Sequence, residues 1–126
     1  MQLNKVTFSS QGVTCSAWLG IPEQPAATPC PAIVLGHGFG AVKDALIVEA
    51  KALTRAGFIT LAIDYRSFGE SGGEVRGNLF PLDQVEDFRN AISWLQARDD
   101  VDSERIGIFG MSFGGGIVIQ TAAVDR

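Results

Sequence analysis

Hydrophobic and polar residues alternate along the first twenty positions of the chain. The polar stretch SSQG at positions 9–12 separates two alternating runs, and residues 21–31 then include four prolines. Period-two alternation on both sides of a turn predicts an antiparallel β-hairpin. The proline-rich segment predicts a loop that cannot join a strand ladder, because proline has no backbone N–H. The apolar positions of the predicted hairpin are Leu3, Val6, Phe8, Val13, Cys15, Ala17 and Leu19.

Three short apolar runs follow, each continued by a polar or glycine-rich loop and then by a helical pattern. The runs are residues 32–35, 58–63 and 105–110. Continuous runs of this length are typical of strands buried on both faces of a parallel sheet. Their alternation with helices predicts an α/β fold with right-handed crossovers and helices on both faces of the sheet. In such sheets functional residues gather at the carboxyl ends of the strands.

The helical segments carry more detailed predictions. Asp44 is placed to cap a first helix that runs from about residue 45 to Gly57, and residues 112–124 predict a third. The second helix is expected to begin near Pro81. Its periodicity predicts an apolar face of Leu82, Val85, Phe88, Ile92 and Leu95 and a wet side with Asp83, Asp87 and Asn90.

Composition and charge exclude several classes of protein. The chain has 126 residues, of which 46% are hydrophobic and 19% charged. This length and composition predict one folded domain and not a disordered segment. A net charge of −4 argues against electrostatic binding to the phosphates of nucleic acids. We expect neither a secretory signal nor a membrane span, and no metal or cofactor. Cys15 and Cys30 lack metal-site spacing, which predicts free thiols and a cytoplasmic location.

The most informative motif is GMSFG at residues 110–114, between a predicted strand and a predicted helix. A serine on such a sharp turn projects its hydroxyl into the cleft, and the flanking glycines allow the close backbone approach. The free N–H groups of the new helix point toward an oxyanion formed there. This context predicts that Ser112 is a nucleophile. The alternative is a glycine-rich turn in which Ser112 only caps the helix.

A second motif, HGFG at residues 37–40, follows the first predicted parallel strand. Acyl transfer requires two N–H donors directed at the developing oxyanion. We expect one from the backbone of Phe113, directly after the nucleophile, and the other from the backbone of Phe39. The side chains of Phe39 and Phe113, together with Phe68, are candidates for an apolar substrate pocket, although they could equally belong to the core.

Together with DYRSFGESGG at residues 64–73, these motifs resemble the signatures of the α/β-hydrolase superfamily, near its dienelactone hydrolase-like and serine-peptidase-like groups. The resemblance covers the N-terminal half of that fold: an antiparallel hairpin and then a parallel sheet with helices on both faces. It implies a serine hydrolase with Ser112 as nucleophile and Phe39 and Phe113 as oxyanion-hole donors. A carboxylic ester is the expected substrate, with a peptide or other amide less favoured and acyl transfer third. A serine at this position speaks against dehalogenases and against dienelactone hydrolase itself.

The chain departs from the family in one respect. The family order is serine, then an acid, then histidine, but the single histidine, His37, precedes Ser112. We expect His37 to stabilise its turn or line the pocket, and Asp64 to organise its loop, with Arg66 as a candidate partner. Residues 1–126 are therefore expected to form a single incomplete domain, cut before the sixth strand and without the triad acid and histidine. Such a chain would be inactive alone and would self-associate through an exposed edge strand between Ile106 and Gly110.

Two other functions fit parts of the sequence. A non-catalytic binding or scaffold protein of the same fold would also lack the acid and base. A dinucleotide-binding domain would use Gly36 to Ala41 as a G-x-G-x-x-A fingerprint, with Asp64 as the ribose-binding acid. The antiparallel hairpin and the late position of Asp64 argue against that second alternative.

Overall fold

Strands and helices alternate in the predicted order in the computed structural model, which describes residues 3–38, 42–73, 76, 81–110 and 113–124. The elements are β1 (Leu3–Ser10), β2 (Val13–Gly20), β3 (Cys30–Gly36), the 3-10 helix η1 (Lys43–Leu46), α1 (Ile47–Arg55), β4 (Ile59–Ile63), α2 (Pro81–Gln96), β5 (Val101–Gly110) and α3 (Phe113–Val124).

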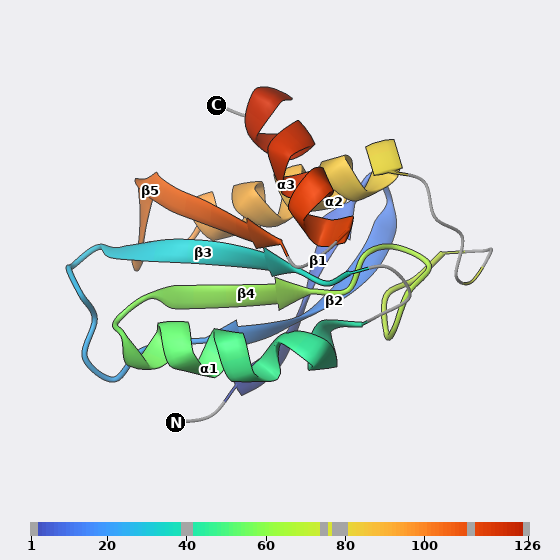
Figure 1. Ribbon diagram of the computed structural model, residues 1–126. Coiled ribbons are helices and arrows are strands. Elements are labelled where there is room, and N and C mark those ends of the chain that lie inside the picture. Colours follow the sequence, from blue (N-terminus) through green and yellow to red (C-terminus); the bar gives the residue numbers. More distant parts are fainter. Residues whose placement is uncertain (1–2, 39–41, 74–75, 77–80, 111–112, 125–126) are drawn as a thin grey trace.

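The strands of the described chain form one five-stranded sheet in the order β1-β2-β4-β3-β5 (Figure 1). The hairpin strands β1 and β2 pair antiparallel, and β2 is also antiparallel to β4. The remaining neighbours, β4 with β3 and β3 with β5, are parallel. The hairpin turns at Gln11 and Gly12, which both have positive φ, as tight hairpin turns require. The predicted combination of a hairpin and a parallel sheet is confirmed.

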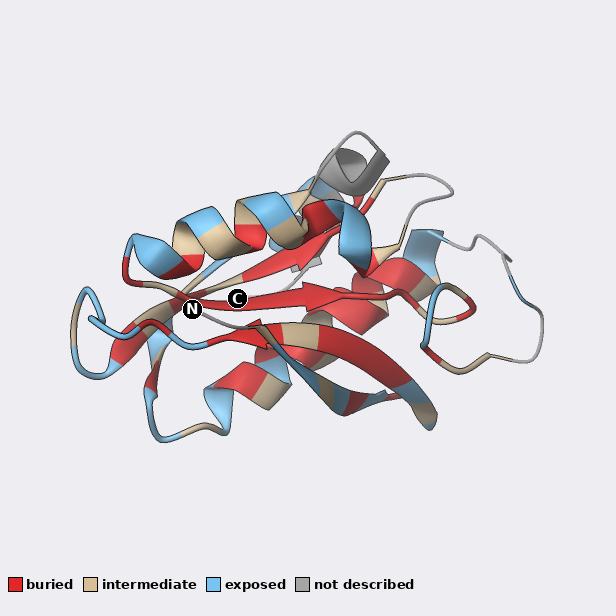
Figure 2. Ribbon diagram, turned by 90° about the horizontal axis from the view of Figure 1, so that it is seen from below, coloured by how far each residue is buried: buried red, intermediate tan, exposed pale blue. Residues whose placement is uncertain are grey.

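Helices cover both faces of the sheet, with α1 on one side and α2 and α3 on the other (Figure 1). The larger core lies under α2 and α3, where Phe88, Leu95 and Ile117 pack on the sheet. A smaller core, which includes Leu46 and Ala50, lies under α1. Figure 2 shows the result: the central strands are buried along their length, whereas the outward sides of the helices are exposed.

Several finer predictions were wrong for identifiable reasons. Asp44 does not cap a helix, because the first turn begins at Lys43, two residues before the predicted start, and the Asp44 carboxylate instead accepts a hydrogen bond from the Trp18 indole at 2.7 Å. Leu82 points to solvent with 76% of its surface exposed. Asp87, predicted on the wet side, is fully buried because its flank of α2 faces the hairpin and the loop after β4, which supply hydrogen-bond donors.

The proline-rich segment ends earlier than predicted, because β3 already begins at Cys30. Pro31 therefore lies within a strand, and the pairing of β3 with β5 shifts register between Cys30 and Ala32. This irregularity accommodates a residue that cannot donate to the ladder. On the other side, β5 begins at Val101, four residues before the predicted start.

Candidate active site

The three parallel strands β3, β4 and β5 end level with one another, so their carboxyl ends lie side by side. Gly36, the last residue of β3, pairs with Ile63 at the end of β4 and with Gly110 at the end of β5. The three motifs leave the sheet at these strand ends, and Figure 1 shows the strands pointing to the same side of the molecule. The sequence motifs 37–40, 64–73 and 110–114 therefore start from neighbouring points, as expected of a functional site in an α/β sheet.

The predicted nucleophile motif spans the junction between β5 and α3. The strand ends at Gly110 and the helix begins at Phe113, so only two residues connect them. Ser112 and Phe39 lie outside the described residues, and Phe113 is described only as the first residue of α3. The roles of Ser112, Phe39 and Phe113 therefore stay predictions, although the strand and the helix on either side of Ser112 are those that the motif requires.

His37 is buried at the end of β3 and is held by two hydrogen bonds. Its Nδ1 lies 3.0 Å from the carbonyl oxygen of Gly38, and its Nε2 accepts the backbone N–H of Tyr65 at 3.4 Å. These bonds require a neutral ring with its proton on Nδ1. Burial lowers the pKa of His37 below 6.5, and the bond to Gly38 and the charge of Asp64 offset only part of that effect. His37 thus stabilises its turn, which is one of the two roles that the sequence left open.

Aromatic rings surround His37 on the inner side of the site. The Tyr65 ring meets it edge-on with ring centroids 4.4 Å apart, and the Phe68 ring lies 5.8 Å away. Phe68 is half-buried and packs against the larger core. The environment of His37 is therefore apolar, consistent with the lowered pKa.

Asp64, directly after β4, is fully buried, and its carboxylate accepts three hydrogen bonds from described residues. Its donors are the backbone N–H of Lys43 at 2.7 Å, the Lys43 ammonium at 2.9 Å and the backbone N–H of Glu70 at 3.0 Å. The predicted partnership between Asp64 and Arg66 was wrong. The chain turns after Tyr65, so Arg66 faces α2 instead, and Lys43 is the cation that neutralises Asp64.

Lys43 is a buried lysine that sequence reasoning missed, with only 2% of its side chain exposed. Its ammonium also bonds a Glu70 carboxylate oxygen at 2.8 Å and lies 5.2 Å from the centre of the Trp18 ring. Burial opposes its charge, but the bonds to Glu70 and Asp64 outweigh that effect and raise the pKa of Lys43. Lys43 and Lys5 together lower the pKa of Glu70 to about 2. Nothing in the sequence near Lys43 marks it as buried.

Arg66 forms a second buried ion pair, with Asp87 of α2. The Asp87 carboxylate accepts the backbone N–H of Arg66 at 2.8 Å, its Nε–H at 2.9 Å and the Ser10 hydroxyl at 2.6 Å. Arg66 also donates to Gln11 at 2.8 Å. The loop after β4 is thereby fastened to α2 on one side and to the hairpin on the other.

Two glycines of the site are required by close packing. Gly69 has φ +54°, and a Cβ there would overlap the Asp64 carboxylate. A Cβ at Gly36 would overlap the Tyr65 hydroxyl and the Phe88 ring. Both positions therefore need glycine to let the Asp64–Glu70 loop close over the end of the sheet.

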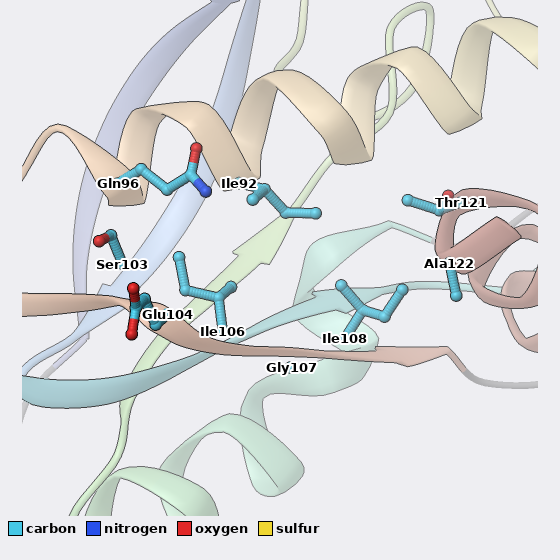
Figure 3. Close-up of a pocket in the computed structure, with 9 residues that line it drawn as sticks. All are labelled: Ile92, Gln96, Ser103, Glu104, Ile106, Gly107, Ile108, Thr121 and Ala122. Carbon is cyan, nitrogen blue, oxygen red and sulfur yellow. The ribbon is translucent and has the colours of Figure 1, made fainter. Parts of the chain in front are cut away.

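One pocket lies away from these strand ends. It measures about 480 Å³ and opens between β5, α2 and α3, and its lining includes Ile92, Ile106, Ile108 and Thr121 (Figure 3). Its walls come from the first part of β5, not from the end at Gly110, so it is separate from the candidate active site. Within the described ranges, no group of three or more His, Cys, Asp or Glu side chains could hold a metal ion. No described helix is long and apolar enough to cross a membrane.

Comparisons with known proteins agree with this geometry. The chain is 41% identical over 122 residues to the quorum-quenching protein AidA of Acinetobacter baumannii, covering 96% of this chain and 40% of that protein. It is 34% identical over 116 residues to a thiohydrolase of Eupenicillium brefeldianum, covering 91% and 36%. The crystal structure of the α/β hydrolase GrgF from a Penicillium species matches with a TM-score of 0.91 at 30% identity, covering 99% of this chain and 43% of that chain.

The chain spans between about a third and two-fifths of the length of the curated relatives it matches. Its sheet and helices superpose on the fold of an α/β hydrolase over 99% of this chain. The family profile described as X-Pro dipeptidyl-peptidase (S15 family) matches residues 11–126. The chain therefore belongs to the X-Pro dipeptidyl-peptidase (S15) family, within the α/β-hydrolase superfamily.

Proposed function

We propose that this protein is a serine hydrolase that cleaves a carboxylic ester, with Ser112 as its nucleophile. The observation that carries the proposal is the two-residue junction between β5 and α3, because the family motif GMSFG places Ser112 directly before the first residue of α3. Relatives that are an α/β hydrolase and a thiohydrolase support hydrolytic chemistry. The free thiols of Cys15 and Cys30 support a reducing, cytoplasmic location.

The proposed reaction has two steps. In the first, the Ser112 oxygen bonds the carbonyl carbon and gives its proton to a base, and the carbonyl electron pair forms an oxyanion held by the N–H groups of Phe39 and Phe113. Collapse of this intermediate breaks the ester C–O bond, and the alcohol leaves with the proton from the base. In the second step, water bonds the acyl carbon and gives a proton to the base, the bond from that carbon to the Ser112 oxygen breaks, and the Ser112 oxygen takes the proton as the acid leaves. In the family order the base and its acid follow Ser112, so we assign this activity to the complete protein.

A thioester is the second candidate substrate, and one comparison favours it. The thiohydrolase of Eupenicillium brefeldianum shares 34% identity with this chain. The same serine mechanism would break a C–S bond instead of a C–O bond. A peptide or other amide, the second choice from the sequence alone, becomes the third candidate and is supported by the description of the S15 family.

The test is labelling of the complete protein with a fluorophosphonate, followed by mapping of the modified residue. We expect covalent modification at Ser112, and none in the Ser112→Ala variant. Hydrolysis of p-nitrophenyl acetate, an acetyl thioester and Ala-Pro-p-nitroanilide then ranks the three substrate classes. A complete protein that resists labelling and cleaves none of them would contradict the proposal and favour a binding or scaffold role.

The other alternative, a dinucleotide-binding domain, is not supported, because the antiparallel hairpin of β1 and β2 is foreign to the sheet of a dinucleotide-binding fold.

A further inference from the structure

The connection between β3 and α1 is tied at its two ends to two consecutive residues that follow β4, Tyr65 at one end and Asp64 at the other. Before the connection, His37 Nε2 accepts the backbone N–H of Tyr65 at 3.4 Å. After it, the Lys43 backbone N–H and ammonium donate to the Asp64 carboxylate at 2.7 and 2.9 Å. Phe39, the expected oxyanion-hole donor, lies in sequence between these two anchors.

We propose that Lys43 and Asp64 are positioning residues that set the backbone carrying the Phe39 N–H donor relative to the nucleophile. This inference rests on the proposed function, because it assigns a role within that same site. Asp64 acts on both loops at once: its side chain holds Lys43 on the β3–α1 connection, and it also accepts the N–H of Glu70 within its own loop at 3.0 Å. The two loops are therefore fixed relative to each other through one carboxylate.

The energetics of the pair support a positional role. Burying a lysine and an aspartate carries a desolvation penalty that the ion pair repays only in part, so an apolar pair of similar volume often gives equal or greater stability. Lys43 and Asp64 are nevertheless 2% and 0% exposed. What an apolar pair could not supply is the orientation of the Lys43 backbone N–H, which bonds the same carboxylate as the ammonium does.

The consequence for catalysis is a matter of distance. Loss of one oxyanion-hole donor costs about 10²–10³ in kcat, and a misplacement of about 1 Å at a reacting group can cost 10²-fold. Replacing Lys43 with a neutral residue keeps the hydrogen bond from its backbone N–H to Asp64 but removes the bond from its ammonium. We therefore expect a fall in kcat of about 10- to 100-fold, with KM changed less than about threefold because the ground state does not use the oxyanion donors.

The experiment uses the complete protein and three variants: Lys43→Met, which keeps most of the length of the side chain without its charge, Glu70→Gln, and Thr54→Val as a control for lost stability. Glu70 is half-exposed, so Glu70→Gln loosens Lys43 without endangering the fold. Thr54 is buried in α1 and bonds Ala50 and Thr60, at the end of β4 opposite Asp64, so Thr54→Val removes a buried hydrogen bond without touching the β3–α1 connection or the loop after β4.

Two readouts separate positioning from general stability. One is the division between kcat and KM for p-nitrophenyl acetate, and the other is the inhibition constant of a trifluoromethyl ketone, whose hemiketal oxyanion occupies the same donors. We expect both kcat and inhibitor affinity to fall about 10- to 100-fold in Lys43→Met and about threefold in Glu70→Gln. Thr54→Val should lose stability but keep both values within about threefold of the starting protein.

The outcomes distinguish this inference from the proposed function. If the unmodified protein is not labelled at Ser112, the proposed function fails, and this inference fails with it. If Ser112 is labelled but Lys43→Met and Glu70→Gln keep the original kcat and inhibitor affinity, only the inference is overturned. If Lys43→Met does not fold, Glu70→Gln alone decides. A loss of kcat in Thr54→Val equal to that in Lys43→Met would also overturn it, because stability alone would then explain the effect.

Discussion

Replacing Asp87 with asparagine should destabilise the protein by about 3 kcal/mol. Its carboxylate accepts bonds from the Arg66 backbone and side chain and from the Ser10 hydroxyl, at 2.8, 2.9 and 2.6 Å. An asparagine amide offers one oxygen, and its NH₂ group would face donors. Each lost hydrogen bond to a charged group costs about 1.5–3 kcal/mol, and breaking a buried ion pair costs about 3–5 kcal/mol. Because 15% of the Arg66 side chain is exposed, we take the lower end.

Urea denaturation of the complete protein, followed by tryptophan fluorescence, measures this loss. With an m-value of about 3 kcal/mol/M, the midpoint should fall by about 1 M. Asp83→Asn is the matched control, because Asp83 lies on the same helix but is 42% exposed and 3.8 Å from Arg66. Exposed pairs contribute about 0–1 kcal/mol, so its midpoint should shift by less than about 0.3 M. Equal shifts in the two variants would refute the reasoning that burial of Asp87 makes its pair strong.

Three further predictions follow from the same structure. Gly36→Ala should lower the free energy of unfolding by about 1–3 kcal/mol, because the new methyl group would overpack against Tyr65. Gly12→Ala should lower it less, because only the positive φ opposes a side chain there, and urea midpoints of the two variants measure the difference. The lowered pKa of His37 means that the unfolded chain binds more protons, so stability should fall as pH drops below 6.5, and His37→Gln should flatten that slope in urea titrations between pH 5 and 7. We propose that the 126-residue chain self-associates through the β5 edge; light scattering should show this, and a monodisperse monomer would contradict it.

The fold could be predicted because its signals are local. The run at residues 32–35 and the strand Ile59–Ile63 have no polar side chain except Thr60, and such runs pair in the middle of a sheet. Element ends were less predictable. Pro31 looked incompatible with a strand, but a register shift next to it lets β3 begin at Cys30, and only the partner strand determines whether such a shift occurs.

The partners of buried charges could not be predicted for a different reason. Arg66 is two residues from Asp64, so sequence proximity favoured that pair. The structure pairs Asp64 with Lys43, 21 residues away, because adjacent parallel strands bring the ends of β3 and β4 together. A sequence shows which residues are charged. Which donors a buried carboxylate bonds depends on the loops that the sheet brings next to it. The same applies to Asp87, whose donors come from the hairpin and the loop after β4.

The loop after β4 explains why the site needs a ten-residue motif besides the nucleophile turn. The Asp64 side chain holds the β3–α1 connection, while the Asp64 carbonyl accepts the Ser71 hydroxyl at 2.8 Å. Ser71 in turn accepts the backbone N–H of Ser16 in the hairpin at 2.8 Å. Gly69 leaves room for the Asp64 carboxylate, where a Cβ would overlap it. Through these contacts the motif holds the hairpin and the β3–α1 connection in fixed positions relative to each other. Changes in it should alter the rate of catalysis through the position of other groups, and not through contact with the substrate.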